Sequence, residues 1–448
     1  MEEKISTSEE TEVGEDKMKI LEAAVDELYS YNDHYFEHHD LSEANLKNKR
    51  INDRLDEVLK KFEEYKAEVV ALPENRAKYW YQLGRAHNVL PSYSVKAEEA
   101  LAKAVKLDPK LIPAWNQLGE CYWKKDNFQE AKNCFQGALS QSENKVSLRN
   151  LSILARQDLA ENFKEKVKNV ELGVSLARQA VQIDTNDGVS WSILGNAYLV
   201  QFFTMQQNAQ SLKLAMSAYA QAEKDPAAKN SPDLHYNKAV AYKYEEKYEE
   251  ALLGFTRAKE LDPTWDAPKT KQQQLLRFLD NILEMVRTKG KLKAKRLNFL
   301  LQSIDNKHLG PFADGSFKTN NGKSCRLEHV NLSDLNSGLN SEKVILGKVI
   351  CSVHDDDSVP FTFCIIDKQQ TVIPVMLYNL SEGKGVIIGD SVAIPEPLLK
   401  CFQFNFNSKV YKFNSIRVNS PLVMVVNGKA LSKDYMASVQ FSTFTLHQ

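Results

Sequence analysis

Apolar and small residues recur along the N-terminal part of the chain with the spacing of paired antiparallel helices. The clearest copy places Trp115 and Tyr122 around Gly119 in one helix, and Ala131 and Phe135 in the next. Small residues let two helices approach closely, while the large residues fill the wedge between them. One such pair cannot bury its apolar face alone, so at least three must stack. The pattern therefore predicts an α-helical solenoid.

The spacing returns often enough to identify it as that of tetratricopeptide repeats. The further copies begin at Trp80, Leu148, Trp191 and His235, and the copy from Leu148 is degenerate. In one of them the interval from Trp191 to Ala215 is eight residues longer than that from Trp115 to Ala131. We expect an insertion within residues 200–210 to lengthen the turn between those two helices.

Beyond the repeats, the pattern changes to the alternation of β-strands. Phe402, Phe404 and Phe406 alternate strictly and precede a polar turn at residues 407–409, which predicts a hairpin. Five to seven short strands without a long helix fit a small Greek-key barrel of the oligonucleotide/oligosaccharide-binding (OB) type, with a β-sandwich as the alternative. The three phenylalanines could stack on bases, but one face of a barrel is core, which favours packing.

The expected organisation is multidomain, α followed by β. We expect an acidic disordered tail at 1–15, capping helices at 16–72, tetratricopeptide repeats at 73–267, C-terminal capping helices with a basic run at 268–304, an irregular linker at 305–324, and an OB-fold barrel with a C-terminal tail at 325–448.

Composition narrows the function classes. The net charge of -1 argues against an electrostatic grip of the whole chain on DNA or a membrane. Apolar segments are too short to span a bilayer and the acidic start is unlike a signal peptide, so we expect a protein kept inside the cell. The six cysteines are scattered, without Cys-x-x-Cys, and are expected to be reduced.

Catalytic motifs are absent from the sequence. It contains no phosphate-binding glycine loop and no nucleophile elbow, so we expect no enzyme and no cofactor. His34 and His38, with Glu37 and Asp40 near them, could hold a metal, but an exposed amphipathic helix end explains them as well.

Helical arithmetic identifies a candidate binding stripe opposite the packing face of the repeats. At roughly 100° per residue, this stripe includes Arg156, Asn196 and Asp233. A groove with Arg156 and Asp233 on its walls suits a short peptide that carries both charge signs. The alternative is that these are solvated polar positions.

A second candidate is a basic run without intervening acids. Its six cations are Arg287, Lys289, Lys291, Lys293, Lys295 and Arg296. Such a cluster can follow the phosphates of RNA or DNA, although ordinary helix ends also collect basic residues. We expect a polyanion contact here.

Several segments resemble the tetratricopeptide repeat protein five family. They are residues 103–109, 114–119, 122–125, 144–148, 345–349 and 388–397, and the likeness extends from about residue 21 to 429. The resemblance also covers the order of repeats and OB barrel.

The resemblance implies an adaptor with two roles, in the cytoplasm and in the nucleus. On the ribosome, the groove of the family binds the Met-Arg-Glu start of nascent α- and β-tubulin. It then triggers decay of tubulin messenger RNA through a bridging factor to a deadenylase complex. In the nucleus, the family acts with a histone acetyltransferase coactivator complex in the stress and p53 response. The competing hypothesis is a nucleic-acid- or chromatin-binding scaffold that acts mainly through the barrel. No membrane partner is implied.

The resemblance also assigns site residues. It implies that Arg156 reads the glutamate of the peptide and Asp233 its arginine, while Asp266 stands one residue before the position of a second acid in the family. Asn196 and Asn237 complete the candidate peptide site. Ribosome contact is implied for Lys293 and Lys295, with Lys291 and Arg296 as their neighbours; no metal ligand is implied.

Overall fold

The computed structural model describes residues 2–157, 160–205, 208–313, 317–318, 324–354, 356–357 and 359–437. Its internal contacts divide the chain into two compact units. Among the described residues, the first unit includes the chain up to Glu246 and residues Gly254–Asp266, and the second includes Lys247–Leu253 and the chain from Ala267 to residue 437. Each unit is described separately below.

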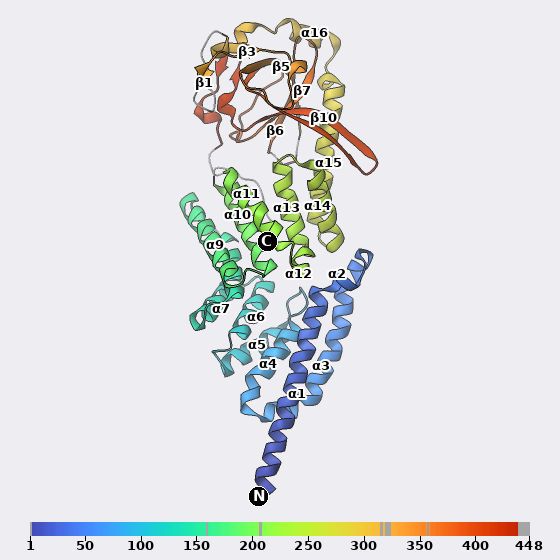
Figure 1. The fold of residues 1–448 in the computed structure, drawn as a ribbon, viewed down its shortest axis with the longest axis vertical. Helices are drawn as coiled ribbons and strands as arrows, with labels where there is room; N and C mark the ends of the chain where they lie inside the picture. Colours follow the sequence, from blue (N-terminus) through green and yellow to red (C-terminus); the bar gives the residue numbers. More distant parts are fainter. Residues whose placement is uncertain are drawn as a thin grey trace. The chain divides into compact units, whose positions relative to one another are not determined.

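The first unit is helical (Figure 1). Its elements are α1 (Glu2–Asp33), α2 (Tyr35–His38), η1 (Leu41–Leu46), α3 (Lys47–Ala71), α4 (Pro73–His87), α5 (Val95–Leu107), α6 (Ile112–Lys124), α7 (Phe128–Gln141), α8 (Lys145–Gln157), α9 (Phe163–Ile183), α10 (Gly188–Thr204), α11 (Ala209–Ala222), α12 (Pro226–Lys229), α13 (Pro232–Tyr244) and part of α14 (Tyr248–Leu261). The predicted repeats are the pairs α4/α5, α6/α7, α8/α9 and α10/α11, together with α13/α14, in which Gly254 packs on Ala239.

The glycines of the repeat pattern permit close packing within each pair. A Cβ atom on Gly119 would lie 2.6 Å from Cε1 of Phe135, and one on Gly195 would lie 2.5 Å from Cε1 of Tyr219. Real Cβ atoms do not approach other atoms so closely, so these two positions require glycine. Phe135 and Tyr219 are both fully buried, and the predicted solenoid packing is confirmed.

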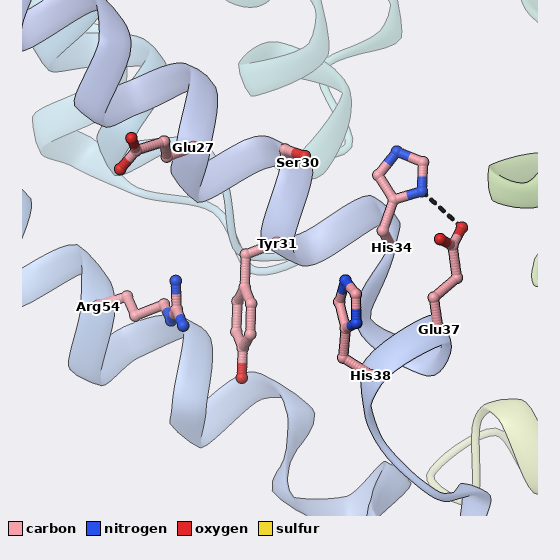
Figure 2. A pocket seen from close by; sticks show the side chains of 7 residues that line it. All are labelled: Glu27, Ser30, Tyr31, His34, Glu37, His38 and Arg54. Atoms are coloured by element: carbon pink, nitrogen blue, oxygen red, sulfur yellow. Dashed lines mark hydrogen bonds and ion pairs between the residues drawn. The ribbon is translucent and has the colours of Figure 1, made fainter.

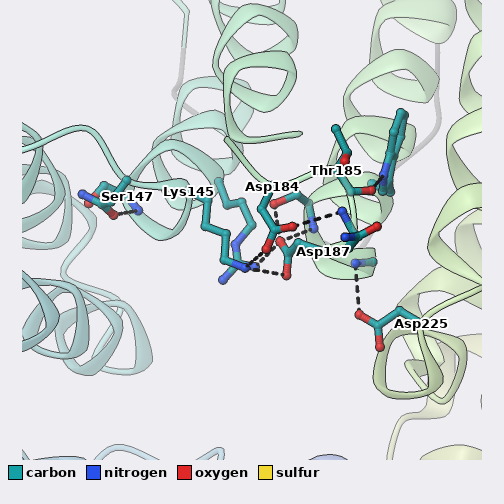
Figure 3. A network of polar contacts seen from close by, with 12 residues as sticks. Lys145, Ser147, Asp184, Thr185, Asp187 and Asp225 are labelled. Atoms are coloured by element: carbon teal, nitrogen blue, oxygen red, sulfur yellow. Dashed lines mark hydrogen bonds and ion pairs between the residues drawn. The ribbon is translucent and has the colours of Figure 1, made fainter. Parts of the chain in front are cut away.

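A polar network links the start of α10 to neighbouring helices (Figure 3). Asp187 caps α10 by accepting a hydrogen bond from the Ser190 backbone N–H at 3.0 Å. The same carboxylate pairs with Arg149 at 2.8 Å and with Lys145 at 3.4 Å. Burial alone would raise the pKa of Asp187, but Arg149, Ser190 and Lys145 together hold it below its ordinary value. The network therefore fixes α8 against α10.

The helices of this unit differ from two expectations. Residues 1–15 were expected to form a disordered tail, whereas α1 begins at Glu2. From Gly14 onward the helix is packed, because Gly14 is buried against Leu72 and Lys17 pairs with Glu68 at 2.7 Å. The eight-residue insertion lengthens the helices on both sides of the turn: α10 has 17 residues against 13 in α6, and α11 begins six residues before Ala215, whereas α7 begins three before Ala131.

The second unit contains a β-barrel and the helices that adjoin it. Its elements are α15 (Asp266–Arg287), η2 (Lys289–Lys291), α16 (Ala294–Gln302), η3 (Asn306–Phe312), β1 (Phe317–Lys318), β2 (Ser324–Cys325), β3 (Glu328–His329), η4 (Leu332–Asp334), β4 (Gly338–Leu339), β5 (Lys343–Val353), β6 (Phe361–Ile366), β7 (Val372–Leu377), β8 (Ser391–Pro395), β9 (Leu398–Phe406), β10 (Lys409–Val418), η5 (Pro421–Val423), β11 (Val425–Val426), β12 (Lys429–Ala430) and η6 (Lys433–Tyr435).

The main sheet has the order β12-β11-β8-β5-β6-β7-β10-β9-β4. Strands β5, β6 and β7 pair antiparallel in sequence, whereas β10 returns to pair with β7 in parallel, at Ile416 opposite Val375. Both side chains are fully buried with Ile345, Phe363 and other residues of the barrel core. This arrangement is the predicted OB-type barrel.

The predicted hairpin at residues 402–413 joins β9 to β10. Phe402 stacks on Phe413 with ring centroids 4.7 Å apart, and Tyr248 lies 5.2 Å from Phe402. Phe404 is buried and stacks on Tyr411. These aromatic side chains contact one another, which favours packing over base stacking.

The cap expected over residues 268–304 belongs instead to the second unit. Along α15, Lys271 pairs with Asp357, and Asp280 accepts a hydrogen bond from Lys409 at 2.6 Å. The expected linker at 305–324 is also partly packed, because Leu309 in η3 joins a buried cluster with β5 and β8. Amphipathic periodicity showed that α15 buries one face but not against which partner. Residues 314–316 and 319–323 of the expected linker lie outside the described residues.

Candidate functional site

Arg156 lies in the last turn of α8 and its charged end is buried. Its Nε donates to the carbonyl oxygen of Ser152 at 3.0 Å, whereas both terminal nitrogens are buried without a hydrogen-bond partner among the described residues. Burial lowers the pKa of Arg156 to about 10, and nearby Tyr219 acts in the opposite direction. The guanidinium therefore stays charged at neutral pH. A buried charge without a partner is costly, and such groups mark functional positions.

Gly173 in α9 makes room for this side chain. A Cβ atom there would lie 2.6 Å from Cγ of Arg156 and 3.0 Å from its Cδ. Ser152 also donates its hydroxyl to the Gly173 carbonyl at 2.7 Å, which joins the two helices beneath the arginine. The stem and Nε of Arg156 are thus held, and its two terminal nitrogens are buried without a hydrogen-bond partner among the described residues.

Tyr219, Asn196 and Asn237 form a buried network in the next two repeats. Tyr219 donates its hydroxyl to Oδ1 of Asn196 at 2.8 Å, and Nδ2 of Asn237 donates to the same oxygen at 3.0 Å. The remaining oxygen of Asn237 is buried without a partner among the described residues. The charge of Arg156 favours ionisation of the Tyr219 hydroxyl, although burial still raises the pKa of Tyr219 above its ordinary value.

The two predicted acidic residues differ in setting. Asp233 is half-buried in the first turn of α13, one turn before Asn237 on the same helix. Asp266 is exposed in the first turn of α15. Asp233 thus shares a helix with the polar network, whereas no hydrogen bond or ion pair among the described residues links Asp266 to that network.

The stripe is less open than the arithmetic suggests. Leu199, Tyr236 and Val240 lie on it but are at most 2% exposed, because neighbouring helices cover them. Sequence reasoning also missed Tyr219 and Gly173 as members of the site. The available signal was that Tyr219 occupies the position at which other repeats carry Phe135 and Phe255.

The basic run surrounds a break in the helices. Gly290 has a φ of 69° between α15 and α16, and a Cβ atom there would lie 2.9 Å from the Ile350 carbonyl oxygen. Lys291 pairs with Glu284 at 3.0 Å. Lys293, Lys295 and Arg296 are exposed, and they make no ion pair within the described part of the chain. Three exposed cations are therefore available to a polyanion.

A hollow of about 550 Å³ lies at α1, α2 and α3 (Figure 2). In it, His34 pairs with Glu37 at 2.7 Å, which raises the pKa of His34, and Arg54 lies 3.7 Å from the ring centre of Tyr31. Within the described ranges, no group of three or more His, Cys, Asp or Glu side chains is arranged to hold a metal ion. Nor does any described helix have the length and apolar character needed to cross a membrane.

Comparison with known proteins covers both units. A family model described as "Tetratricopeptide repeat protein 5 OB fold domain" matches residues 326–440, and tetratricopeptide repeat models match 112–145 and 232–264. Tetratricopeptide repeat protein 5 of Homo sapiens is 47% identical over 413 residues, which cover 92% of this chain and 93% of that protein. The chain belongs to the tetratricopeptide repeat protein 5 family. The protein of that name from Bos taurus is 46% identical over 94% of this chain and 95% of its own length.

Membership of the tetratricopeptide repeat protein 5 family confirms the resemblance and the fold class. The chain is a repeat adaptor of that family, a scaffold for binding proteins or peptides, followed by an OB domain. The similarity to the relatives extends over both units, so the family includes the helical repeats and the OB domain together.

Proposed function

We propose that the chain is an adaptor whose repeat groove binds the Met-Arg-Glu start of nascent α- and β-tubulin on the ribosome. The observation that carries this proposal is the buried guanidinium of Arg156, whose two terminal nitrogens have no partner among the described residues. A carboxylate can accept two parallel hydrogen bonds from this fork. Such a pair recognises glutamate by charge and by shape.

Asp233 is the proposed partner for the arginine of the peptide. Opposite charges on the groove walls favour a ligand with the reverse order of charges and oppose other sequences. Because the nitrogens of Arg156 are covered, the peptide has to displace side chains on entry. We expect association below the roughly 10⁵ M⁻¹s⁻¹ of unsteered docking.

The basic run is the proposed ribosome contact. Lys293, Lys295 and Arg296 are exposed and lack intramolecular ion pairs in the described structure, as a phosphate-binding surface requires. With peptide and ribosome bound together, the adaptor recruits a bridging factor and a deadenylase complex to the tubulin messenger RNA. Binding through two weak contacts gives selectivity for ribosomes that display the peptide.

A second proposed role, as a stress-response transcription cofactor with a histone acetyltransferase complex, would use the same scaffold in the nucleus. The alternative function, nucleic-acid binding through the barrel, receives less support. The aromatic side chains of β9 and β10 pack against one another and against Tyr248, which occupies the ring faces that bases would need.

The test uses ribosomes stalled with a short nascent tubulin chain. The protein should co-sediment with ribosomes displaying Met-Arg-Glu-Ile and not with those displaying Met-Arg-Gln-Ile, because the buried guanidinium requires a carboxylate. Arg156→Ala should abolish this preference, while Arg76→Ala, at an exposed arginine of α4, should preserve it. Equal binding to both nascent chains by the parent protein would contradict the proposal.

A further inference from the structure

Tyr219 carries a hydroxyl that its packing position does not need. The equivalent position in two other repeats is Phe135 or Phe255. The ring of Tyr219 covers Gly195 at 2.5 Å from a would-be Cβ, as Phe135 covers Gly119 at 2.6 Å. Since phenylalanine suffices for this contact elsewhere in the solenoid, the hydroxyl serves a different purpose.

The hydroxyl of Tyr219 and the amide of Asn237 donate to the same acceptor, the side-chain oxygen of Asn196. Oδ1 of Asn196 accepts from Tyr219 at 2.8 Å and from Nδ2 of Asn237 at 3.0 Å. Asn196 is 7% exposed, and Tyr219 and Asn237 are fully buried. The shared acceptor commits the donor side of Asn237 to the interior of the network. Its acceptor oxygen is the atom left without a partner in the described structure.

A buried amide oxygen needs an N–H or O–H donor, and an extended peptide offers a main-chain N–H at every residue. The nearby guanidinium of Arg156 needs the opposite, an acceptor. The Asn237 oxygen and the Arg156 guanidinium could therefore bind a peptide residue that has an acidic side chain and main-chain N–H groups around it.

We infer that Tyr219 is a positioning residue of the groove: through Asn196 it holds Asn237 so that Oδ1 accepts a hydrogen bond from the main chain of the bound peptide. This inference rests on the proposed function, since it concerns the same groove. Under this inference, specificity and affinity come from two different residues. Arg156 distinguishes glutamate from other residues, and Asn237 contributes affinity independently of the side chain.

The experiment measures the affinity of a Met-Arg-Glu-Ile peptide for the full chain by calorimetry. Tyr219→Phe should weaken binding about fivefold and Asn237→Leu about tenfold, as expected for one lost hydrogen bond each. The double variant should bind about as weakly as Asn237→Leu alone, because the two residues act through one contact. Tyr219→Phe should also leave the ratio of affinities for Met-Arg-Glu-Ile and Met-Arg-Gln-Ile unchanged.

The matched control is Tyr198→Phe. Tyr198 lies in α10, and its hydroxyl accepts from Nε of Arg178 at 2.7 Å, apart from the network. This variant should bind within about twofold of the parent. Should Tyr219→Phe fail to fold, Asn196→Leu removes the same hydrogen bonds and must show the same lack of additivity with Asn237→Leu.

The possible outcomes distinguish failure of the proposed function from failure of the positioning role of Tyr219. No peptide binding by the parent chain would overturn the proposed function and this inference together. Binding by the parent with unchanged affinity in Tyr219→Phe, or losses that multiply in the double variant, would overturn the positioning role alone. A loss of affinity in Tyr219→Phe that also reduces the ratio of affinities for the glutamate and glutamine peptides would overturn the positioning role too, because it would show general damage to the groove.

Discussion

Arg156 and Lys293 carry the same charge in opposite settings. The guanidinium of Arg156 is buried with its Nε fixed and its terminal nitrogens without partners in the described residues, whereas Lys293 is exposed at the start of α16. A buried charge interacts strongly and is little affected by salt, but it accepts only a group that fits. An exposed cluster attracts any polyanion and weakens as salt rises. The first setting suits recognition of a sequence and the second suits attachment to a ribosome.

The largest effect should come from Arg156→Ala. Loss of one partner from a buried charge pair costs about 2–5 kcal/mol, which corresponds to at least tens-fold in affinity. Calorimetry with a Met-Arg-Glu-Ile peptide measures this loss, with Arg76→Ala as the control. An unchanged affinity in Arg156→Ala would place the glutamate site elsewhere. The functional contrast between the buried Arg156 and the exposed Lys293 would then be lost.

The second test reverses charge in the basic run. Lys293→Glu with Lys295→Glu should weaken ribosome co-sedimentation about tenfold and reduce its dependence on salt, because two phosphate contacts are lost. Binding of the isolated peptide should stay within about twofold, roughly 0.4 kcal/mol. The control is Lys60→Glu with Lys61→Glu, which makes the same charge change at two exposed lysines of α3.

If the lysine control loses as much ribosome binding as the basic-run variant, net charge and not the location of these lysines is responsible. Equal loss of peptide and ribosome binding in the basic-run variant would mean that the run supports the fold of the groove.

A third test disturbs the setting of Arg156 without removing its charge. Gly173→Ala introduces a Cβ atom 2.6 Å from Cγ of Arg156, so the arginine stem must shift. We expect peptide affinity to fall about fivefold. Stability should also fall, because the new Cβ atom would lie 3.0 Å from the backbone oxygen of Ser152, and the gain of about 1 kcal/mol in helix propensity offsets only part of that loss. Thermal unfolding and calorimetry on the same sample measure both quantities. Full affinity with Gly173→Ala would show that the position of the stem is unimportant.

The smallest effect concerns Asp187, a partly buried charge that already has partners. Asp187→Ala removes a helix cap and two ion pairs, and should lower stability by about 1 kcal/mol at pH 7. Since the folded pKa of Asp187 is depressed, its contribution is complete above the unfolded pKa near 4 and is lost as the pH falls through the folded value. Denaturation of both proteins between pH 7 and pH 3 should therefore show curves that converge in acid. A constant difference would mean that Asp187 acts only by packing.

Local spacing predicted the repeats and the barrel because their signals lie within one pair of elements. Gly119 and Phe135 identify a helical pair from their separation, and the alternation at Phe402 and Phe404 identifies a hairpin. Angular arithmetic also placed Arg156 and Asn196 on one stripe. It could not show that helix packing would bury Leu199 on the same stripe, because burial depends on the neighbouring repeat.

The features that sequence reasoning missed depend on contacts between distant segments. The role of Gly173 follows from its approach to Arg156 across two helices, and the hydrogen bond of Tyr219 joins α11 to α10. Likewise, the apolar face of α15 was visible from its periodicity, but its partner was not. Lys271 and Asp357 pair across more than eighty residues of sequence, and nothing local indicates this contact.

The most direct test of glutamate recognition by Arg156 compares two peptides that differ only in a carboxylate replaced by an amide. The affinities of Met-Arg-Glu-Ile and Met-Arg-Gln-Ile for the parent chain should differ at least tens-fold, since the glutamine amide cannot replace a carboxylate at the two terminal nitrogens of Arg156. Because the guanidinium is buried, the ratio should persist when the salt concentration is raised. Equal affinities for the two peptides, or a ratio that disappears with salt, would contradict the claim that Arg156 reads the acidic residue.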